Sequence, residues 1–323
     1  MEKSTRRELI KVSGVLGIAL IVFMLLGTGI SLLVRRIYAA EILPKTFTVE
    51  CLFQVLYTVL AILLPFSLCR IWVEHIQGRA RGSLIPFQKP KNAALFWCAL
   101  GVGFMACMLS NLFTSWFVVS MENAGFTFDS ASFGTPTTAG GYFWSILADA
   151  FVPALCEEYA LRGVVLQSLR KYGESMAIGI SSLLFALMHG NATQAPFAFL
   201  LGIVIGRLAI ATDSLWTGIA IHFLNNTYAV VMSALNDKGN TMNTAVVVVL
   251  VYTFSIAIGL MCIVLLRTGY RWRDREVLQN PGETAQEKRV NRWQAELYTI
   301  LSLPMFISLV LLFHAVFATV SRG

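Results

Sequence analysis

Long apolar runs separated by short polar loops make up most of this chain. The runs cover residues 12–34, 51–69, 93–121, 142–169, 176–188, 197–211, 215–235, 244–266 and 297–320. Strands of a membrane barrel would alternate apolar and polar residues over about ten positions, whereas these runs are continuous. The pattern therefore predicts helices, whose backbone polar groups are satisfied within each segment. Because the runs 176–188 and 197–211 are short, we predict an all-α, polytopic integral membrane helical bundle of about eight to nine transmembrane helices.

The distribution of Lys and Arg predicts how these helices are oriented. The most basic loops are 76–92, 170–175 and 267–295, whereas the loop 122–141 contains neither Lys nor Arg. Positive residues favour the cytoplasmic side, so we expect a cytoplasmic N-terminus and cytoplasmic basic loops. The loop 122–141, rich in Gly, Ser and Thr, is expected outside and flexible. One loop departs from the rule, because it holds Arg35, Arg36 and Lys45 and yet is placed outside. We predict a single membrane domain, 1–323, in the cell membrane.

Composition supports this class and excludes others. The chain is 56% hydrophobic and 13% charged, whereas soluble domains carry about 25% charged residues. A net charge of +7 would favour nucleic-acid binding in a soluble protein, but here the basic residues flank apolar runs. We therefore expect membrane lipid as a partner, and no nucleic acid. The six cysteines form no CxxC pair, so they indicate no metal site of that type.

Three charged residues stand inside the run 142–169: Glu157, Glu158 and Arg162. A charge in the middle of a membrane helix costs roughly 2.5–3.5 kcal/mol on insertion scales. Glu158 and Arg162 are four residues apart, so they share one helix face and can pair. Glu157 points about 100° away and has no local partner. It is therefore a candidate for acid–base chemistry, although both glutamates could instead tie helices together.

Neighbouring runs contain polar side chains that could complete a site. His189 ends the run 176–188, and His222 and Asn226 lie four residues apart in the run 215–235. A glutamate and a histidine can activate a water molecule, and a histidine and an amide can stabilise an oxyanion. This is a peptidase set without a serine or cysteine nucleophile. His75 and His314 have no acidic neighbour at helical spacing, so we assign them no role.

A divalent metal is an alternative use of the same residues. Glu157, His189 and His222 are ligand types that zinc accepts. The chain contains neither an HExxH motif nor a G-x-S-x-G elbow. We expect no tightly bound cofactor, with zinc as the alternative.

Four motifs in order resemble those of one protein family. They are Glu157-Glu158-x-x-x-Arg162, Phe185-x-x-x-His189, Phe199-x-x-Gly202-x-x-x-Gly206 and His222-x-x-x-Asn226. Each motif alone is weak, but the ordered set is similar to that of the CPBP family. This family comprises CAAX prenyl-protease (Ras-converting enzyme) relatives and bacteriocin-processing or Abi-type proteins. The resemblance covers residues 140–235, which we take as the catalytic core, and the basic cytoplasmic loop 267–295 lies outside it.

The resemblance implies an intramembrane endopeptidase, either glutamate-type or metal-dependent, with a peptide or protein substrate at the membrane as its partner. It implies that Glu157 and His189 activate the water and that His222 and Asn226 stabilise the oxyanion. Glu158 and Arg162 complete the first motif, with a structural or orienting part for Arg162. Two other functions stay open: a non-catalytic membrane regulator or immunity protein of the same fold, and an ion-coupled transporter. A transporter is disfavoured because the polar residues cluster in one region rather than in two repeated halves.

Overall fold

The protein is a bundle of long apolar helices. The computed structural model describes residues 2–128, 136, 138–237, 241–273 and 292–322. Within these residues, seven helices are long and apolar enough to cross a membrane, or eight if a bent pair near the C-terminus counts as one span. The chain is thus a multi-pass helical membrane protein, and the predicted fold class is confirmed.

The first part of the chain forms one side of the bundle. Helix α1 (Lys3–Ala39) packs against α3 (Leu64–Ile76), which continues α2 (Phe47–Thr58) through the π-helical segment Val59–Leu63. Helix α4 (Ala93–Asn123) lies on the other side of the molecule, against α9 and α11. Side-chain oxygens of Thr46 and Asn92 accept from the first turns of α2 and α4, which satisfies backbone donors at both helix starts.

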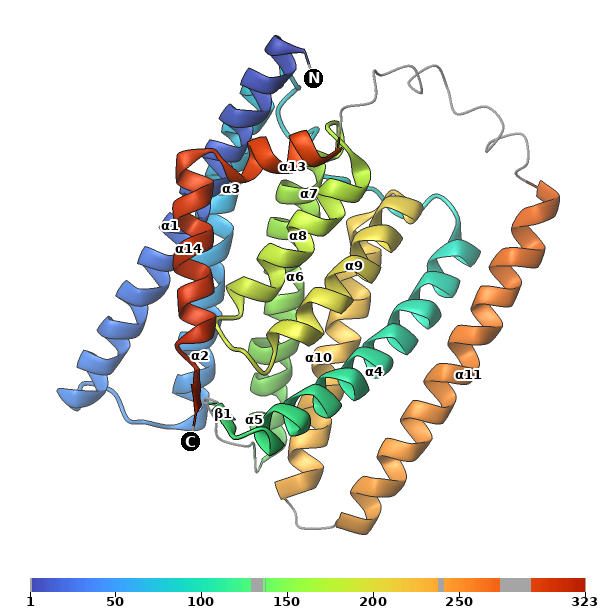
Figure 1. The fold of residues 1–323 in the computed structure, drawn as a ribbon. Helices are drawn as coiled ribbons and strands as arrows, with labels where there is room; N and C mark the ends of the chain where they lie inside the picture. Colours follow the sequence, from blue (N-terminus) through green and yellow to red (C-terminus); the bar gives the residue numbers. More distant parts are fainter. Residues whose placement is uncertain (1, 129–135, 137, 238–240, 274–291, 323) are drawn as a thin grey trace.

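The middle of the bundle is one long helix that contains the two adjacent glutamates. It runs from Ala139 to Arg170 as α5 (Ala139–Ser145), the π segment Ile146–Phe151, α6 (Val152–Glu158), the π segment Tyr159–Val165 and α7 (Leu166–Arg170). Helices α8 (Glu174–Met188), α9 (Ala195–Thr212) and α10 (Leu215–Asp237) follow. Figure 1 shows α6, α7 and α8 in the centre, between α1, α3 and α14 on one side and α9, α10 and α4 on the other.

Two of the π segments have a cause in the sequence. Pro65 and Pro153 each come directly after the start of the helix that follows a π segment. A proline has no backbone N–H, and its ring clashes with the carbonyl four residues earlier in an α-helix. A wider turn relieves this clash, and such π turns are frequent at functional sites. Both of these wide turns lie on helices that contribute residues to the candidate site.

The C-terminal part departs from the predicted single span 297–320. Helices α13 (Arg292–Ile300) and α14 (Leu303–Phe317) meet at an angle of 82°. Pro304 in the first turn of α14 cannot donate to the carbonyl of Ile300, and Ser302 is extended, so the helix breaks there. The predicted loop 267–295 is also partly helical, because α11 (Thr241–Arg273) extends through its first residues and α13 includes its last ones. Residues 274–291 lie outside the described residues.

The loop predicted at 122–141 contains one short strand that the sequence pattern did not predict. Strand β1 (Phe126–Phe128) pairs antiparallel with β2 (Val320–Arg322) at the end of the chain, with Thr127 opposite Ser321. Residues 129–135 and 137 of this loop lie outside the described part. Just before β2, the Thr319 hydroxyl accepts from the backbone N–H of Ala192. The C-terminal segment therefore contacts the loop that follows His189.

Helix α8 is shorter than a membrane span. Its 15 residues correspond to about 22 Å at 1.5 Å per residue, less than the roughly 30 Å hydrocarbon core of a bilayer. The run predicted at 176–188 is therefore present as a helix, but His189 at its end lies within the bundle rather than beyond it.

The contact between α1 and α14 generates the first prediction. A Cβ atom on Gly17 would lie 2.2 Å from the backbone nitrogen of Met305, whereas Gly14 on the same helix has no such neighbour within 4 Å. We predict that Gly17→Ala forces α14 away and destabilises the protein by about 1–3 kcal/mol. Thermal unfolding of the purified protein in detergent measures this. Gly14→Ala is the control, and equal melting temperatures for the two variants would contradict the contact.

Candidate active site

A buried ion pair lies at the centre of the candidate site. Arg162 Nη1 donates to Glu158 Oε1 over 2.8 Å, and both side chains are fully buried. Arg162 Nη2 also donates to the carbonyl of Gly202 in α9 over 3.4 Å. The guanidinium lies 4.4 Å from the centre of the Phe185 ring in α8. The pairing that the spacing of Glu158 and Arg162 predicts is therefore present, and it joins the central helix to α8 and α9.

His222 of α10 joins the same cluster. Its Nδ1 lies 3.1 Å from Glu158 Oε1, and its Nε2 lies 3.8 Å from Glu157 Oε2. Because a carboxylate only accepts, Nδ1 must carry the proton of this hydrogen bond. The contact depends on a glycine one turn earlier, since a Cβ on Gly218 would lie 2.5 Å from Glu158 Oε2. One carboxylate thus fixes the orientation of His222 and turns its second nitrogen toward the other carboxylate.

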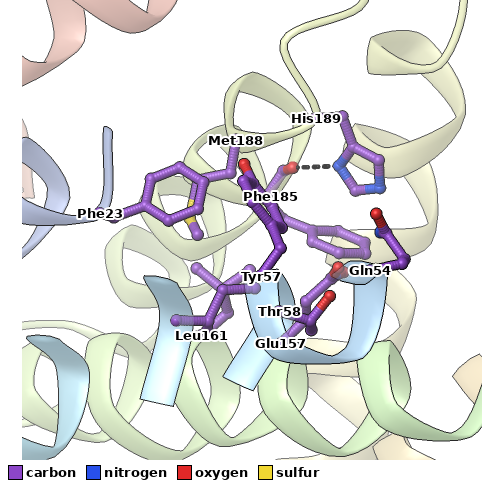
Figure 2. Close-up of a pocket in the computed structure, with 10 residues that line it drawn as sticks. Phe23, Gln54, Tyr57, Thr58, Glu157, Leu161, Phe185, Met188 and His189 are labelled. Atoms are coloured by element: carbon purple, nitrogen blue, oxygen red, sulfur yellow. Dashed lines mark hydrogen bonds between the residues drawn. The ribbon is translucent and has the colours of Figure 1, made fainter. Parts of the chain in front are cut away.

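Glu157 points in a different direction from Glu158, into a cavity. The cavity has a volume of about 140 Å³, and its polar wall includes Glu157, His189 and, from α2, Gln54 and Thr58. Figure 2 shows these side chains together at one end of it. Within the described part of the chain the Glu157 carboxylate makes no hydrogen bond, since its 3.8 Å separation from His222 is too long for one. The carboxylate is therefore available to a ligand in the cavity.

His189 enters this cavity from the end of α8. Its Nδ1 lies 2.7 Å from the carbonyl oxygen of Phe185, one helical turn earlier (Figure 2). A carbonyl can only accept, so Nδ1 carries the proton and the neutral imidazole keeps a lone pair on Nε2. The Phe185 ring stacks edge-on against both His189 and His222, with ring centres 4.9 and 5.5 Å apart. Phe185 therefore orients both histidines.

Asn226 lies beside the cluster rather than in it. Its Nδ2 donates to the backbone carbonyl of Asp149 over 3.1 Å. Pro153 comes four residues after Asp149 and cannot donate the α-helical hydrogen bond to that carbonyl, so Asn226 supplies a donor. The Asp149 carboxylate accepts from Ser145. Among the described residues, neither Asn226 nor His222 is part of the wall of the 140 Å³ cavity.

Two polar side chains at this site were not among the residues predicted from the sequence. Gln54 and Thr58 line the cavity from α2, in the run 51–69 that the apolar pattern marks only as a span. They are four residues apart and so share one helix face. The spacing of these two polar residues within an apolar run could have indicated a polar face on this helix. Nothing local indicates that α2 packs against a segment about a hundred residues later.

The predicted zinc ligands are not assembled in this arrangement. In residues 2–128, 136, 138–237, 241–273 and 292–322, no three His, Cys, Asp or Glu side chains lie close enough to hold a metal ion. His222 is bonded through Nδ1 to Glu158, and His189 through Nδ1 to a backbone carbonyl. Zinc binding by Glu157, His189 and His222 stays the alternative to the expected absence of a tightly bound cofactor.

Comparison with known proteins identifies the same region. Residues 139–228 match the family model described as type II CAAX prenyl endopeptidase Rce1-like. The chain is 31% identical over 96 residues to the membrane-embedded CAAX protease MroQ of Staphylococcus aureus (strain USA300). This match covers 28% of the chain and 39% of the relative. No solved structure matches the chain. The family expected from the four motifs is supported by both matches. The residues matched by the family model include the cluster of Glu157, Glu158, Arg162, His189 and His222.

The buried ion pair generates the second prediction. Arg162→Met leaves Glu158 buried without its cation, which typically destabilises by about 3–5 kcal/mol. The double variant Glu158→Gln/Arg162→Met removes both charges and is expected to recover part of this loss. Thermal unfolding in detergent measures both changes.

The matched control is an exposed ion pair. Lys91 lies 3.0 Å from Asp213, and its side chain is 78% exposed, so Lys91→Met should change stability by less than about 1 kcal/mol. If Arg162→Met and Lys91→Met had equally small effects, the buried pair would not hold the site together.

Proposed function

We propose that this member of the CPBP family of CAAX-type membrane proteases is an intramembrane endopeptidase that hydrolyses a peptide bond by activating water. The observation that carries the proposal is the cavity inside the helical bundle whose wall includes both Glu157 and His189. Glu157 offers a carboxylate without a hydrogen bond, and His189 offers a lone pair on Nε2. A carboxylate and an imidazole that share one cavity can hold a water molecule and remove its proton.

In the first step Glu157 takes a proton from the water, with His189 Nε2 accepting the second hydrogen bond. The water oxygen attacks the carbonyl carbon of the scissile peptide bond, and the carbonyl oxygen becomes an oxyanion. In the second step the C–N bond breaks, and protonated Glu157 returns its proton to the leaving nitrogen. The products are one carboxylic acid, which receives the hydroxyl group of the water, and one amine, which receives its proton.

His222 and Asn226 are suited to different degrees for stabilising the oxyanion. His222 Nδ1 already donates to Glu158, so an oxyanion hydrogen bond from Nε2 requires a second proton on the ring. Asn226 uses one amide hydrogen on the Asp149 carbonyl, and its second hydrogen is left for a ligand. A small shift of α10 toward the cavity would bring both donors to the reacting carbonyl.

Glu158 and Arg162 are positioning residues in this mechanism. Their charges compensate each other, and Glu158 Oε1 also orients His222. The substrate class proposed is a membrane-associated protein or a peptide that enters from the membrane. The relative's name describes a CAAX protease; for this chain we propose peptide hydrolysis without requiring a prenyl group, since no sequence feature calls for one.

The third prediction concerns Glu157. Glu157→Gln removes the proton acceptor but keeps the size of the side chain, so peptide hydrolysis should fall by about 10²–10⁴-fold. Mass spectrometry of new peptide ends, in cells that carry the wild type or the variant, measures this.

Glu174→Gln provides the control, because Glu174 in α8 is a partly exposed glutamate paired with Arg170. It should leave the pattern of peptide ends unchanged. Identical new ends in wild type and Glu157→Gln would refute the peptidase. If Glu157→Gln also rescued a deletion strain, a non-catalytic regulator would be favoured instead.

A further inference from the structure

The cavity beside Glu157 has two chemically different ends. Figure 2 shows Phe23, Leu161 and Met188 at one end, and Gln54, Glu157 and His189 at the other. Ile62 also belongs to its wall. The apolar residues come from α1, from the π segment after α2, from the central helix and from α8. The proposed hydrolysis uses only the polar end, so the apolar end needs a separate explanation.

The size of the cavity limits what it can hold. An engineered apolar cavity of about 150 Å³ binds a benzene molecule. A cavity of about 140 Å³ therefore fits one aliphatic or phenyl side chain. Its volume is smaller than that of a whole prenyl chain. Its contents are thus expected to be one apolar side chain of a peptide, with the peptide group next to it at the polar end.

Gln54 provides what a bound peptide group needs. A peptide unit has one donor and one acceptor, and leaving either unpaired inside a membrane costs several kcal/mol. A substrate helix must lose some of its own hydrogen bonds before one of its peptide bonds can be attacked. The Gln54 side chain has both a donor and an acceptor, lines the cavity opposite the central helix, and makes no hydrogen bond within the described residues.

We propose that this cavity is a substrate subsite: Phe23, Ile62, Leu161 and Met188 bind one large apolar side chain beside the scissile bond, and Gln54 binds the adjacent peptide group. This inference rests on the proposed peptidase function. It makes Gln54 a residue that contacts the substrate backbone, and it makes the apolar wall the determinant of side-chain preference.

The subsite is tested with internally quenched peptides that differ only at the two positions flanking the cleaved bond. These positions carry Gly, Ala, Leu, Phe, Trp or S-farnesyl-cysteine, and the purified protein is reconstituted in lipid vesicles. The wild type should cleave the Leu or Phe peptide with a kcat/KM about tenfold or more above that of the Gly peptide. The farnesyl peptide should gain nothing over the Ala peptide.

Two variants should shift this preference in opposite directions. Phe23→Leu enlarges the apolar end and should raise the rate for Trp relative to Leu, whereas Ile62→Phe fills it and should lower the rate for Phe relative to Ala. A general loss of folding would not produce opposite shifts. Phe254→Leu is the control, because Phe254 of α11 is 61% exposed, and it should leave the ranking unchanged.

The role of Gln54 is tested separately. Gln54→Leu keeps the approximate size but removes the amide, so kcat/KM should fall about tenfold for every peptide while the side-chain ranking is retained. Gln54→Asn, which keeps the amide on a shorter chain, should restore part of the rate. Wild-type rates in Gln54→Leu would overturn the role of Gln54.

The outcomes separate this inference from the peptidase itself. Cleavage that depends on Glu157, with a ranking that neither Phe23→Leu nor Ile62→Phe alters, would overturn the subsite and leave the peptidase intact. Cleavage that survives Glu157→Gln would overturn the peptidase mechanism. If the wild type cleaves no peptide, fluorescence anisotropy of the labelled peptides decides the subsite. Tighter binding of Leu than of Gly, lost in Ile62→Phe, supports it, and no such preference overturns it.

Discussion

The fully buried pair of Glu158 and Arg162 is the interaction on which the rest of this site depends. Two charges inside an apolar bundle are costly unless they compensate each other. Here the Gly202 carbonyl, the Phe185 ring and His222 also contact the pair, whereas Glu158 Oε2 and Arg162 Nε have no hydrogen-bond partner among the described residues. These partners come from α9, α8 and α10. The pair therefore joins the central helix to the three helices that carry the remaining motifs.

The direction of Glu157 follows from this arrangement. Neighbouring residues on a helix point about 100° apart, so fixing Glu158 against α8, α9 and α10 turns Glu157 toward α2 and the cavity. The two adjacent glutamates then differ in surroundings: one carboxylate is enclosed by a cation and a histidine, and the other faces an open space with His189. In the proposed mechanism the first positions His222 and the second moves protons. The two π segments lie directly before and after α6, the helix that ends with these two glutamates, and π turns are frequent at functional sites.

The helices and the contacts within one helix could be predicted from the sequence, because they depend on residues that are close together in the chain. The apolar runs predict the helical bundle, and the four-residue spacing predicts the Glu158–Arg162 pair. Contacts between distant segments could not be predicted in this way: α2 supplies Gln54 and Thr58 to the cavity, and β2 pairs with β1 across almost two hundred residues. The bend at Ser302–Pro304 was missed because the continuous apolar composition of 297–320 was interpreted as one span despite the proline. The hydrogen bond from Asn226 to the carbonyl of Asp149, which Pro153 deprives of its α-helical donor, also joins distant segments and was not predicted.

In the proposed mechanism Glu157 and His189 Nε2 share one water molecule in the cavity. An experimental structure at a resolution that shows ordered water, determined together with metal analysis of the same sample, tests it most directly. We expect one solvent molecule within about 2.6–3.2 Å of both the Glu157 carboxylate and His189 Nε2. A Glu157 carboxylate turned out of the cavity, or a cavity without a solvent site shared by the two side chains, would contradict it.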